Sequence, residues 1–415
     1  MEIYLVGGAV RDKLLNYPSI ENDWVVVGGS PKELLDRGFR QVGSDFPVFL
    51  HPETNDEYAL ARTERKSGHG YAGFTFHAAP DVSLEEDLCR RDLTINAIAM
   101  DDAGNLVDPY EGAQDIQNKL LRHVSPSFAE DPVRILRVAR FAARYHHLGF
   151  TVAEPTKDLM KSMVENGEVD HLVSERVWKE MSRALAEKNP QVFFEVLREC
   201  DALKRLLPEI DNLFGIPQPP QHHPEIDCGI HTLLVLQQAA ILSDKTTVRF
   251  ASLVHDLGKA LTPEDVLPRH IGHESKSGKL IKNMCKRLAI PNEHRDLALG
   301  VAEYHTHCHR VLEMTPKKIL KTLDALDSFR RPERFEEFLL CCEADARGRT
   351  GLENREYPQT KFFKKAFQRC CAISSKDVDS DRYQGKAFGE ELHRLRIHAL
   401  RDFKNSFDST STSFT

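Results

Sequence analysis

The chain has 415 residues, of which 41% are hydrophobic and 29% charged, and this composition excludes a wholly disordered or fibrous protein. The length predicts roughly two to four domains, each long enough to bury a core. Its 56 basic and 63 acidic side chains give a net charge of −7. That charge excludes a generally basic protein that coats nucleic acid, but it is compatible with a local basic groove.

The nine cysteines contain no Cys-x-x-Cys pair, and their odd number argues against a disulfide framework and a thiolate zinc site. The first residues, Met1–Gly8, lack the basic and apolar regions of a signal peptide. No segment approaches the about 20 apolar residues that cross a bilayer. We therefore expect a cytoplasmic protein that does not enter a membrane.

Short apolar runs separated by Gly and Pro dominate the chain up to about residue 125, which is typical of strands alternating with short helices. The runs are Ile3–Val6, Trp24–Val27, Val48–Leu50, Tyr58–Arg62 and Ile95–Met100. After residue 125 the apolar residues recur with the 3.6-residue period of helices. The predicted fold class is α+β, with a small mixed sheet and helices at residues 1–125 and an all-α remainder.

We expect four parts along the chain. An α+β head covers residues 1–125, and a helical neck and body cover 126–215. A second helical domain covers 225–350, and a helical C-terminal region with a frayed tail covers 351–415. The Pro-rich stretch Ile216–Pro224 is interpreted as a linker, and the Ser/Thr-rich end from Ser406 as the frayed tail.

Two features near the N-terminus indicate phosphate chemistry. Gly7 and Gly8 end the first strand before a helix, so backbone N–H groups can approach a phosphate, and Arg11 adds a charge in the first helical turn. Glu21 and Asp23 precede the next strand at positions i and i+2, which share a face. Two such carboxylates suit Mg²⁺ that holds a nucleotide triphosphate and polarises an attacking hydroxyl. Each feature alone is common in turns and solvated loops; their combination in this order is rare.

This Gly-Gly-x-x-Arg-Asp pattern followed by acid-x-acid resembles the DNA polymerase β nucleotidyltransferase superfamily. It is most similar to bacterial CCA-adding enzymes, the tRNA nucleotidyltransferases of the class shared with bacterial poly(A) polymerases. Ser67–Phe74 resembles the flexible glycine-rich loop of that family, Arg90–Ala97 the segment that contacts ribose and phosphates, and Glu130–Phe141 the block that reads the base. One departure is Glu21, where the family usually has Asp. Glu57 is a candidate third acid.

The resemblance implies that the chain adds CTP- and ATP-derived nucleotides to the 3′ end of tRNA, with Mg²⁺ held by Glu21 and Asp23. It assigns nucleotide binding to Gly8, Arg11, Arg91, Asp131, Arg134, Arg137 and Arg140. The tRNA partner is expected to bind through its acceptor and T-arm, and the chain to be a monomer or weak homo-oligomer.

Base selection without a template requires side chains that imitate a pairing edge. Asp131 can accept a hydrogen from the exocyclic amino group of cytosine or adenine, and Arg134 can donate to ring acceptors. At spacing i, i+3 on a helix the two side chains are neighbours. Guanine and uracil present a carbonyl to Asp131 and leave buried polar groups unpaired. The alternative is that Asp131 caps the helix before Pro132 and the arginines form a solvated stripe.

A second constellation contains His255 and Asp256 at the end of an apolar helix. The other candidate ligands are His231, His273, His305 and Asp345. Imidazoles and carboxylates from separate helices can hold one or two divalent ions and activate water for attack on a phosphate ester.

The His-Asp pair resembles the HD phosphohydrolase domain. The resemblance implies phosphatase, 2′-nucleotidase and 2′,3′-cyclic phosphodiesterase activities with Ni²⁺ or another transition metal, at His231, His255, Asp256 and Asp345. His307 and His309 flank His305 and leave the identity of that ligand open, whereas His222 and His223 are interpreted as loop residues.

Three alternatives remain. A bacterial poly(A) polymerase shares the head motifs, but the HD signature and the absence of a long basic tail argue against it. A signalling enzyme with nucleotidyltransferase and HD domains normally carries C-terminal regulatory domains. A non-catalytic RNA-binding adaptor needs neither the carboxylate pair nor the histidine cluster.

Overall fold

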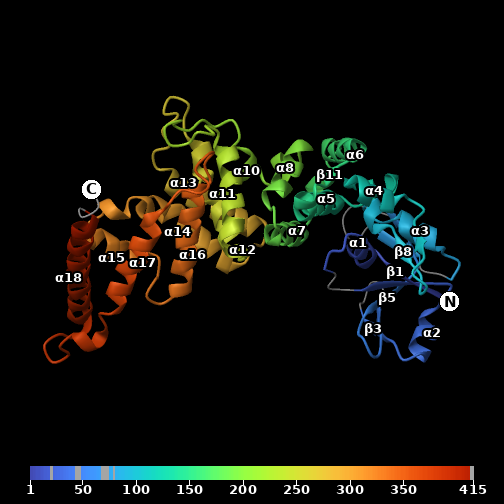
Figure 1. Ribbon diagram of the computed structural model, residues 1–415, viewed down its shortest axis with the longest axis horizontal. Helices are drawn as coiled ribbons and strands as arrows, with labels where there is room; N and C mark the ends of the chain where they lie inside the picture. Colours follow the sequence, from blue (N-terminus) through green and yellow to red (C-terminus); the bar gives the residue numbers. More distant parts are fainter. Residues whose placement is uncertain (19–21, 43–47, 67–73, 78–79, 412–415) are drawn as a thin grey trace. The chain divides into compact units, whose positions relative to one another are not determined.

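The computed structural model describes residues 1–18, 22–42, 48–66, 74–77 and 80–411. The chain forms two compact units, Met1–Leu207 and Pro208–Thr415 (Figure 1). None of the helices in the described part of the chain is long and apolar enough to cross a membrane.

Within the described residues, seven strands of the first unit form one mixed sheet in the order β3-β4-β5-β2-β1-β8-β9. They are β1 (Glu2–Val6), β2 (Asp23–Val27), β3 (Arg40–Val42), β4 (Val48–Leu50), β5 (Glu57–Leu60), β8 (Ala99–Met100) and β9 (Leu106–Val107). Strands β2 and β5 are parallel, and the pairs β1–β2 and β1–β8 are antiparallel. A separate antiparallel pair is formed by β6 (Thr63–Lys66) and β7 (Phe74–His77). The residues between β6 and β7, including most of the expected glycine-rich loop, lie outside the described residues.

Both faces of the central strand β2 are buried, because successive side chains of a strand point to opposite faces. Val25 belongs to one core cluster together with Val6 and Leu88, and Val26 belongs to the other with Phe49. Helices flank the sheet as α1 (Gly8–Leu14), α2 (Pro31–Asp36), α3 (Leu84–Cys89) and α4 (Gly112–Asn118). A Ser–Glu capping box satisfies the first backbone N–H groups of both α2 and α3.

The expected strand Ile95–Met100 is only partly a strand. Residues Thr94–Asn96 form a 3₁₀ turn, and β8 begins at Ala99. The buried Asp92 side chain accepts hydrogen bonds from Leu93 N and Asn96 Nδ2, so it stabilises a turn where the apolar pattern alone predicts an extended chain.

The rest of the first unit is mainly helical. It contains β10 (Leu120–Leu121), β11 (Thr151–Val152), α5 (Val133–Tyr145), α6 (Glu154–Glu165), α7 (Ser174–Ala186), α8 (Gln191–Glu199) and α9 (Ala202–Leu206). Helix α5 packs against both α7 and α8 and is buried along most of its length. This packing brings polar side chains of α5 and α7 next to one another.

The second unit is entirely helical in its described residues. Its helices are α10 (Pro208–Asp211), α11 (Cys228–Leu242), α12 (Thr246–Val254), α13 (His273–Arg287), α14 (Asn292–His309), α15 (Pro316–Ala325), α16 (Pro332–Arg347), α17 (Pro358–Cys371) and α18 (Gly385–Ser411). The short apolar helix α12 contacts α11, α14 and α16. Helix α18 extends past the expected start of a frayed tail at Ser406, since Phe403 and Phe407 pack against Phe362 of α17.

Candidate active sites

A basic pocket of about 990 Å³ lies in the first unit, between the β1–α1 turn and the helices α5 and α7. Ten basic side chains and four acidic ones line it. The basic ones are Arg11, Arg90, Arg91, Arg134, Arg137, Arg140, Arg144, Arg176, Lys179 and Arg183. An excess of guanidinium groups in a concave site suits a triphosphate, which guanidinium forks bind with paired hydrogen bonds.

The β1–α1 turn forms one wall of this pocket. Gly7 has a φ of +66°, and a Cβ at this position would lie 2.8 Å from Arg91 Nη1, so the turn requires glycine. Gly8 begins α1 and lines the pocket. Asp23 begins β2 as the register partner of Val6 and also lines the pocket, so the structure brings it to the glycine turn.

Of the two other expected acids, Glu21 and Glu57, the structure describes only Glu57. Glu21 lies outside the described residues. Glu57 is the register partner of Asp23 in the parallel pair β2–β5. The two carboxylates therefore project from the same face of adjacent strands. Asp23 and Glu57 offer the hard oxygen atoms that Mg²⁺ prefers.

Acidic or amide partners hold the expected nucleotide-binding arginines in place. Arg11 is buried, and its Nη1 donates to Asn96 Oδ1 at 2.6 Å while its Nε donates to Asp12 Oδ1 at 2.8 Å. Arg91 Nη2 lies 3.1 Å from Asp87 Oδ2. The sequence motifs contain Asp12 and Asn96 without identifying them as partners, and Asp87 lies outside the motifs.

Arg137 and Arg140 are each held through Nε. Arg137 Nε donates to Asp92 Oδ2 at 2.6 Å, and Arg140 Nε donates to Glu180 Oε2 at 2.6 Å. These ion pairs do not use the two Nη groups, which form the outer edge of the guanidinium fork. Burial alone raises the pKa of Asp92, but Arg137 and hydrogen bonds from Asn96 and Arg137 lower it well below its usual value.

The two expected base-reading residues both line the pocket at the start of α5, and both already have protein partners. Arg134 Nη1 donates to Ser127 O at 2.9 Å, and its Nη2 donates to Arg90 O at 2.6 Å. The Asp131 carboxylate accepts from both Nη groups of Arg176, at 3.1 and 2.7 Å, and from Val133 N at 3.1 Å. The bond from Val133 N reaches the first residue of α5, but the N-cap of this helix is Pro132 and not Asp131, so the capping alternative does not describe Asp131.

Arg176 of α7 is a pocket residue that the sequence analysis missed. Arg176 is 45 positions from Asp131 along the chain, and it lies outside the segments that resemble the family. The helical period of α7 indicates only that Arg176, Lys179 and Arg183 share a face.

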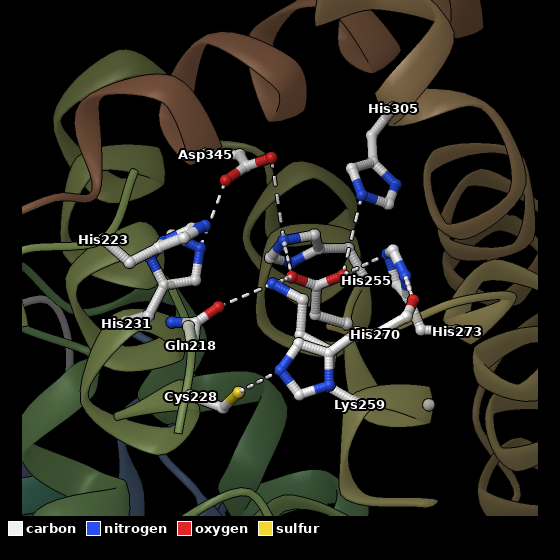
Figure 2. Close-up of polar contacts among 12 residues, drawn as sticks. Gln218, His223, Cys228, His231, His255, Lys259, His270, His273, His305 and Asp345 are labelled. Atoms are coloured by element: carbon white, nitrogen blue, oxygen red, sulfur yellow. Dashed lines mark hydrogen bonds and ion pairs between the residues drawn. The ribbon is translucent and has the colours of Figure 1, made fainter. Parts of the chain in front are cut away.

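The second unit contains a buried histidine–carboxylate site (Figure 2). It joins His231 of α11, His255 and Asp256 after α12, His273 of α13, His305 of α14 and Asp345 of α16. All six residues are between 1% and 9% exposed. The structure thus brings together all six residues predicted for this site from segments more than a hundred residues apart.

The distances identify Asp256 as the centre of the cluster. Its Oδ2 lies 3.1 Å from His255 Nε2, whereas its Oδ1 lies 3.2 Å from His273 Nε2 and 3.6 Å from His305 Nε2. Asp345 Oδ1 lies 3.2 Å from His231 Nε2. Asp256 thus faces His255 through one oxygen atom and His273 and His305 through the other, a geometry that can bridge two ions.

Backbone carbonyls orient all four imidazoles in the same way. The Nδ1 atoms of His231, His255, His273 and His305 lie 2.7–3.0 Å from the carbonyl oxygens of Gly348, Ser252, His270 and Val301, respectively. A proton on Nδ1 leaves the lone pair on Nε2, which is the arrangement of metal-ligating histidine.

Several donor atoms of the cluster lack a hydrogen-bond partner. Nε2 of His231, His255 and His273 and Oδ1 of Asp256 are buried and unsatisfied among the residues that the structure describes. Buried polar atoms are normally paired. A cation between these lone pairs satisfies them, and mixed imidazole and carboxylate donors suit transition metals.

The imidazoles of the cluster differ in charge state. Burial lowers the pKa of His255 and of His273, but Asp256 outweighs burial and raises both, so a cation competes with a proton there. Burial lowers the pKa of His305 to about 3, so this imidazole is neutral near pH 7. Burial opposes ionisation of Asp256 and Asp345, but the neighbouring histidines and, at Asp256, Lys259 hold both pKa values well below the usual range.

The structure distinguishes the three histidines of α14. His305 faces Asp256, and His307 Nδ1 lies 3.0 Å from Thr322 Oγ1. His309 Nε2 donates to Asp345 Oδ2 at 2.6 Å, and its Nδ1 accepts from the Tyr357 hydroxyl at 2.7 Å. His305 is therefore the candidate ligand, and His309 orients a carboxylate.

Comparisons with known proteins agree with this architecture. The model described as "Poly A polymerase head domain" matches residues 3–122, "Probable RNA and SrmB- binding site of polymerase A" matches 149–214, and "HD domain" matches 229–331. The fold and its two sites thus define a protein with a polymerase-type head, a helical body and an HD domain, as predicted.

Two relatives named multifunctional CCA protein match nearly the whole chain. The one from Thioalkalivibrio sulfidiphilus is 62% identical over 404 residues, covering 97% of this chain and 99% of the relative. The one from Teredinibacter turnerae is 58% identical over 406 residues, covering 98% and 99%. The solved Thermotoga maritima CCA-adding enzyme complexed with tRNA has the same fold, with a TM-score of 0.63, 19% identity and coverage of 98% of this chain and 91% of that one. The chain belongs to the family of multifunctional CCA proteins, which confirms the resemblance found in the sequence.

Proposed function

We propose that the chain adds and repairs the 3′-terminal CCA of tRNA, using CTP and ATP and releasing diphosphate. The observation that carries this proposal is the basic pocket, in which Asp23 and the glycine turn lie together with the expected nucleotide-binding arginines. Family membership over nearly the full length supports the choice of substrates. The buried histidine cluster favours this function over that of a poly(A) polymerase or an RNA-binding adaptor.

In this proposal Asp23, with Glu21, holds Mg²⁺ at the β1–α1 turn. Bound Mg²⁺ neutralises triphosphate charge and polarises the attacking hydroxyl. The N–H groups at Gly8 and the arginines Arg11 and Arg91 bind the phosphates, which orients the α-phosphate for in-line attack by the tRNA 3′-hydroxyl. Arg137 and Arg140 complete nucleotide binding through guanidinium groups that Asp92 and Glu180 hold in place.

In this proposal base selection uses the part of the Asp131 carboxylate that its ion pair with Arg176 leaves open. Asp131 already accepts three hydrogen bonds, two from Arg176 and one from Val133 N, so roughly one of its about four acceptor sites is left for a base amino group. Cytosine and adenine can donate to the Asp131 carboxylate through their amino groups, whereas uracil and guanine present a carbonyl there, which cannot donate. Two backbone carbonyls hold Arg134 through one N–H of each Nη group, and the guanidinium has five N–H donors, so others remain for the base.

The histidine cluster is proposed to hydrolyse phosphate esters, as a 2′,3′-cyclic phosphodiesterase, 2′-nucleotidase and phosphatase. His231, His255, Asp256 and Asp345 would hold Ni²⁺ or another transition metal, with His273 and His305 completing a second position. The bound metal lowers the pKa of a water and positions it as nucleophile. Backbone carbonyls already orient the imidazoles, and the carboxylates are ionised, so the donor atoms need little rearrangement to bind a metal.

The proposed partner is tRNA, held through its acceptor and T-arm, with the chain acting in the cytoplasm as a monomer or weak homo-oligomer. The test uses the full chain, tRNA lacking its 3′ end, and labelled CTP and ATP. The expected product has two C residues followed by one A. Long A-only extension supports the poly(A) polymerase alternative, and no extension supports the adaptor.

A further inference from the structure

The segment Ile216–Asp227 precedes α11 and lies between the stretches that match the RNA-binding and HD models. The Pro-rich composition of residues 216–224 predicts a linker, but in the structure the segment is a closed loop. Gln218 N donates to Ile226 O at 2.7 Å, and Cys228 N donates to Ile216 O at 2.9 Å. We call residues 216–227 the strap. Its folded backbone fixes the positions of the side chains that it carries.

The strap places polar side chains inside the HD site (Figure 2). Gln218 is buried, and its Oε1 accepts from Lys259 Nζ at 2.7 Å. The same ammonium group lies 2.6 Å from Asp256 Oδ2. The strap therefore contacts, through Lys259, the carboxylate at the centre of the cluster.

Glu225 makes a more direct contact with a candidate ligand. Its side chain is 1% exposed, and its Oε1 lies 3.0 Å from His231 Nδ1 and 3.0 Å from His223 Nδ1. These two imidazole rings are 4.6 Å apart between centroids. A carboxylate buried this completely beside two imidazoles is part of the site rather than a surface group of a linker.

His231 cannot bind one ion through both ring nitrogens. Its Nδ1 lies 2.9 Å from Gly348 O, which can only accept, so Nδ1 carries a proton, and Nε2 is left to face Asp345 and a metal. Nδ1 donates to this carbonyl, and Glu225 Oε1 lies 3.0 Å from the same nitrogen as a carboxylate beside the N–H group. A carboxylate behind a ligating histidine fixes its tautomer and ring orientation and raises the basicity of the ligating nitrogen.

The backbone of the strap is specialised for this placement. Ile226, next to Glu225, has a φ of +61°, a left-handed conformation that β-branched residues avoid. Asp227 then caps α11 by accepting from Ile230 N at 2.9 Å. The chain thus reverses between an inward carboxylate and a helix cap within three residues.

We infer that Glu225 is a positioning residue of the HD site, which holds His231 with Nδ1 protonated and Nε2 directed at a divalent transition metal. The strap is then a wall of the metal site rather than a linker. This inference rests on the proposed metal-dependent function of the histidine cluster.

The test measures metal affinity and does not depend on activity alone. The full chain is stripped of metal and titrated with Ni²⁺ by calorimetry at constant pH, for the wild type, Glu225→Ala, Glu225→Gln and His222→Ala. Glu225→Ala is expected to weaken Ni²⁺ binding about 10–100-fold, as loss of an outer hydrogen-bond partner does. Glu225→Gln keeps an oxygen that can accept from Nδ1 and is expected to stay within a few-fold of wild type. His222→Ala alters an exposed side chain of the same strap and serves as the matched control.

Melting curves of the metal-free proteins and their nucleotide addition identify variants that fail to fold. Unchanged Ni²⁺ affinity in a folded Glu225→Ala protein overturns the inference, even if its melting temperature is lower. Equal weakening in Glu225→Gln and Glu225→Ala also overturns it, since an acceptor oxygen at this position then does not hold His231. If wild type itself binds no Ni²⁺, the proposed metal site is wrong, which is a different result from either of these.

Discussion

Glu180 of α7 provides a quantitative test of how the nucleotide pocket is held together. Its carboxylate accepts from Arg140 Nε at 2.6 Å, and the two side chains are only 7% and 8% exposed. Arg140 also lies over the Phe141 ring, 4.5 Å from its centroid. Replacing Glu180 by Leu leaves a guanidinium in an almost closed environment without its counter-charge.

Removing one partner of a buried ion pair costs about 3–5 kcal/mol. We expect Glu180→Leu to lower the free energy of unfolding of the first unit by about 3 kcal/mol, the lower end, because Arg140 borders a pocket that admits water. The double variant Arg140→Met with Glu180→Leu should recover most of this loss, since two apolar side chains need no counter-charge.

The assay is urea unfolding followed by tryptophan fluorescence. Both tryptophans, Trp24 and Trp178, lie in the first unit, so the signal reports that unit without a contribution from the second. Glu199→Gln is the matched control, because Glu199 forms an exposed pair with Lys157 and such pairs contribute about 0–1 kcal/mol. A cost for Glu180→Leu no larger than that of the control refutes the argument.

Four further outcomes follow from the two sites. Asp23→Asn should abolish nucleotide addition and leave hydrolysis of a 2′,3′-cyclic nucleotide intact, and joint loss in a folded protein would contradict two independent sites. His255→Ala should remove hydrolysis and bound transition metal while nucleotide addition continues; retained metal with a lowered melting temperature would instead indicate a purely structural histidine. Arg176→Ala frees the base-reading carboxylate and should change the preference among CTP, ATP, UTP and GTP, whereas an equal loss of rate with all four would refute a role in selection. Asp92 has a lowered pKa in the folded state, so its contribution to stability is present above its unfolded pKa of about 3.9 and is lost as pH falls below it. Urea unfolding of Asp92→Asn should therefore show a flatter dependence of stability on pH in that acidic range, and a wild-type slope would contradict this.

Local patterns in the sequence were sufficient for the fold class and for the types of residue in both sites. The apolar run Trp24–Val27 corresponds to β2, and the regular spacing after residue 125 corresponds to helices. Periodicity succeeds here because it reports which face of a single element is buried. It fails at Ile95–Met100, where the side chain of Asp92 hydrogen-bonds the backbone and the chain turns.

Only the tertiary structure decided which polar groups meet. Arg176 pairs with Asp131 across 45 positions, and Glu180 pairs with Arg140 across 40. The strap has the Pro-rich composition of a linker, yet it carries Glu225 to His231. Composition and spacing describe neighbours along the chain, whereas an ion pair depends on how two elements pack and on how far both side chains are removed from water. That information exists only once the chain has folded, and so the partners of these charged residues could not be predicted from the sequence.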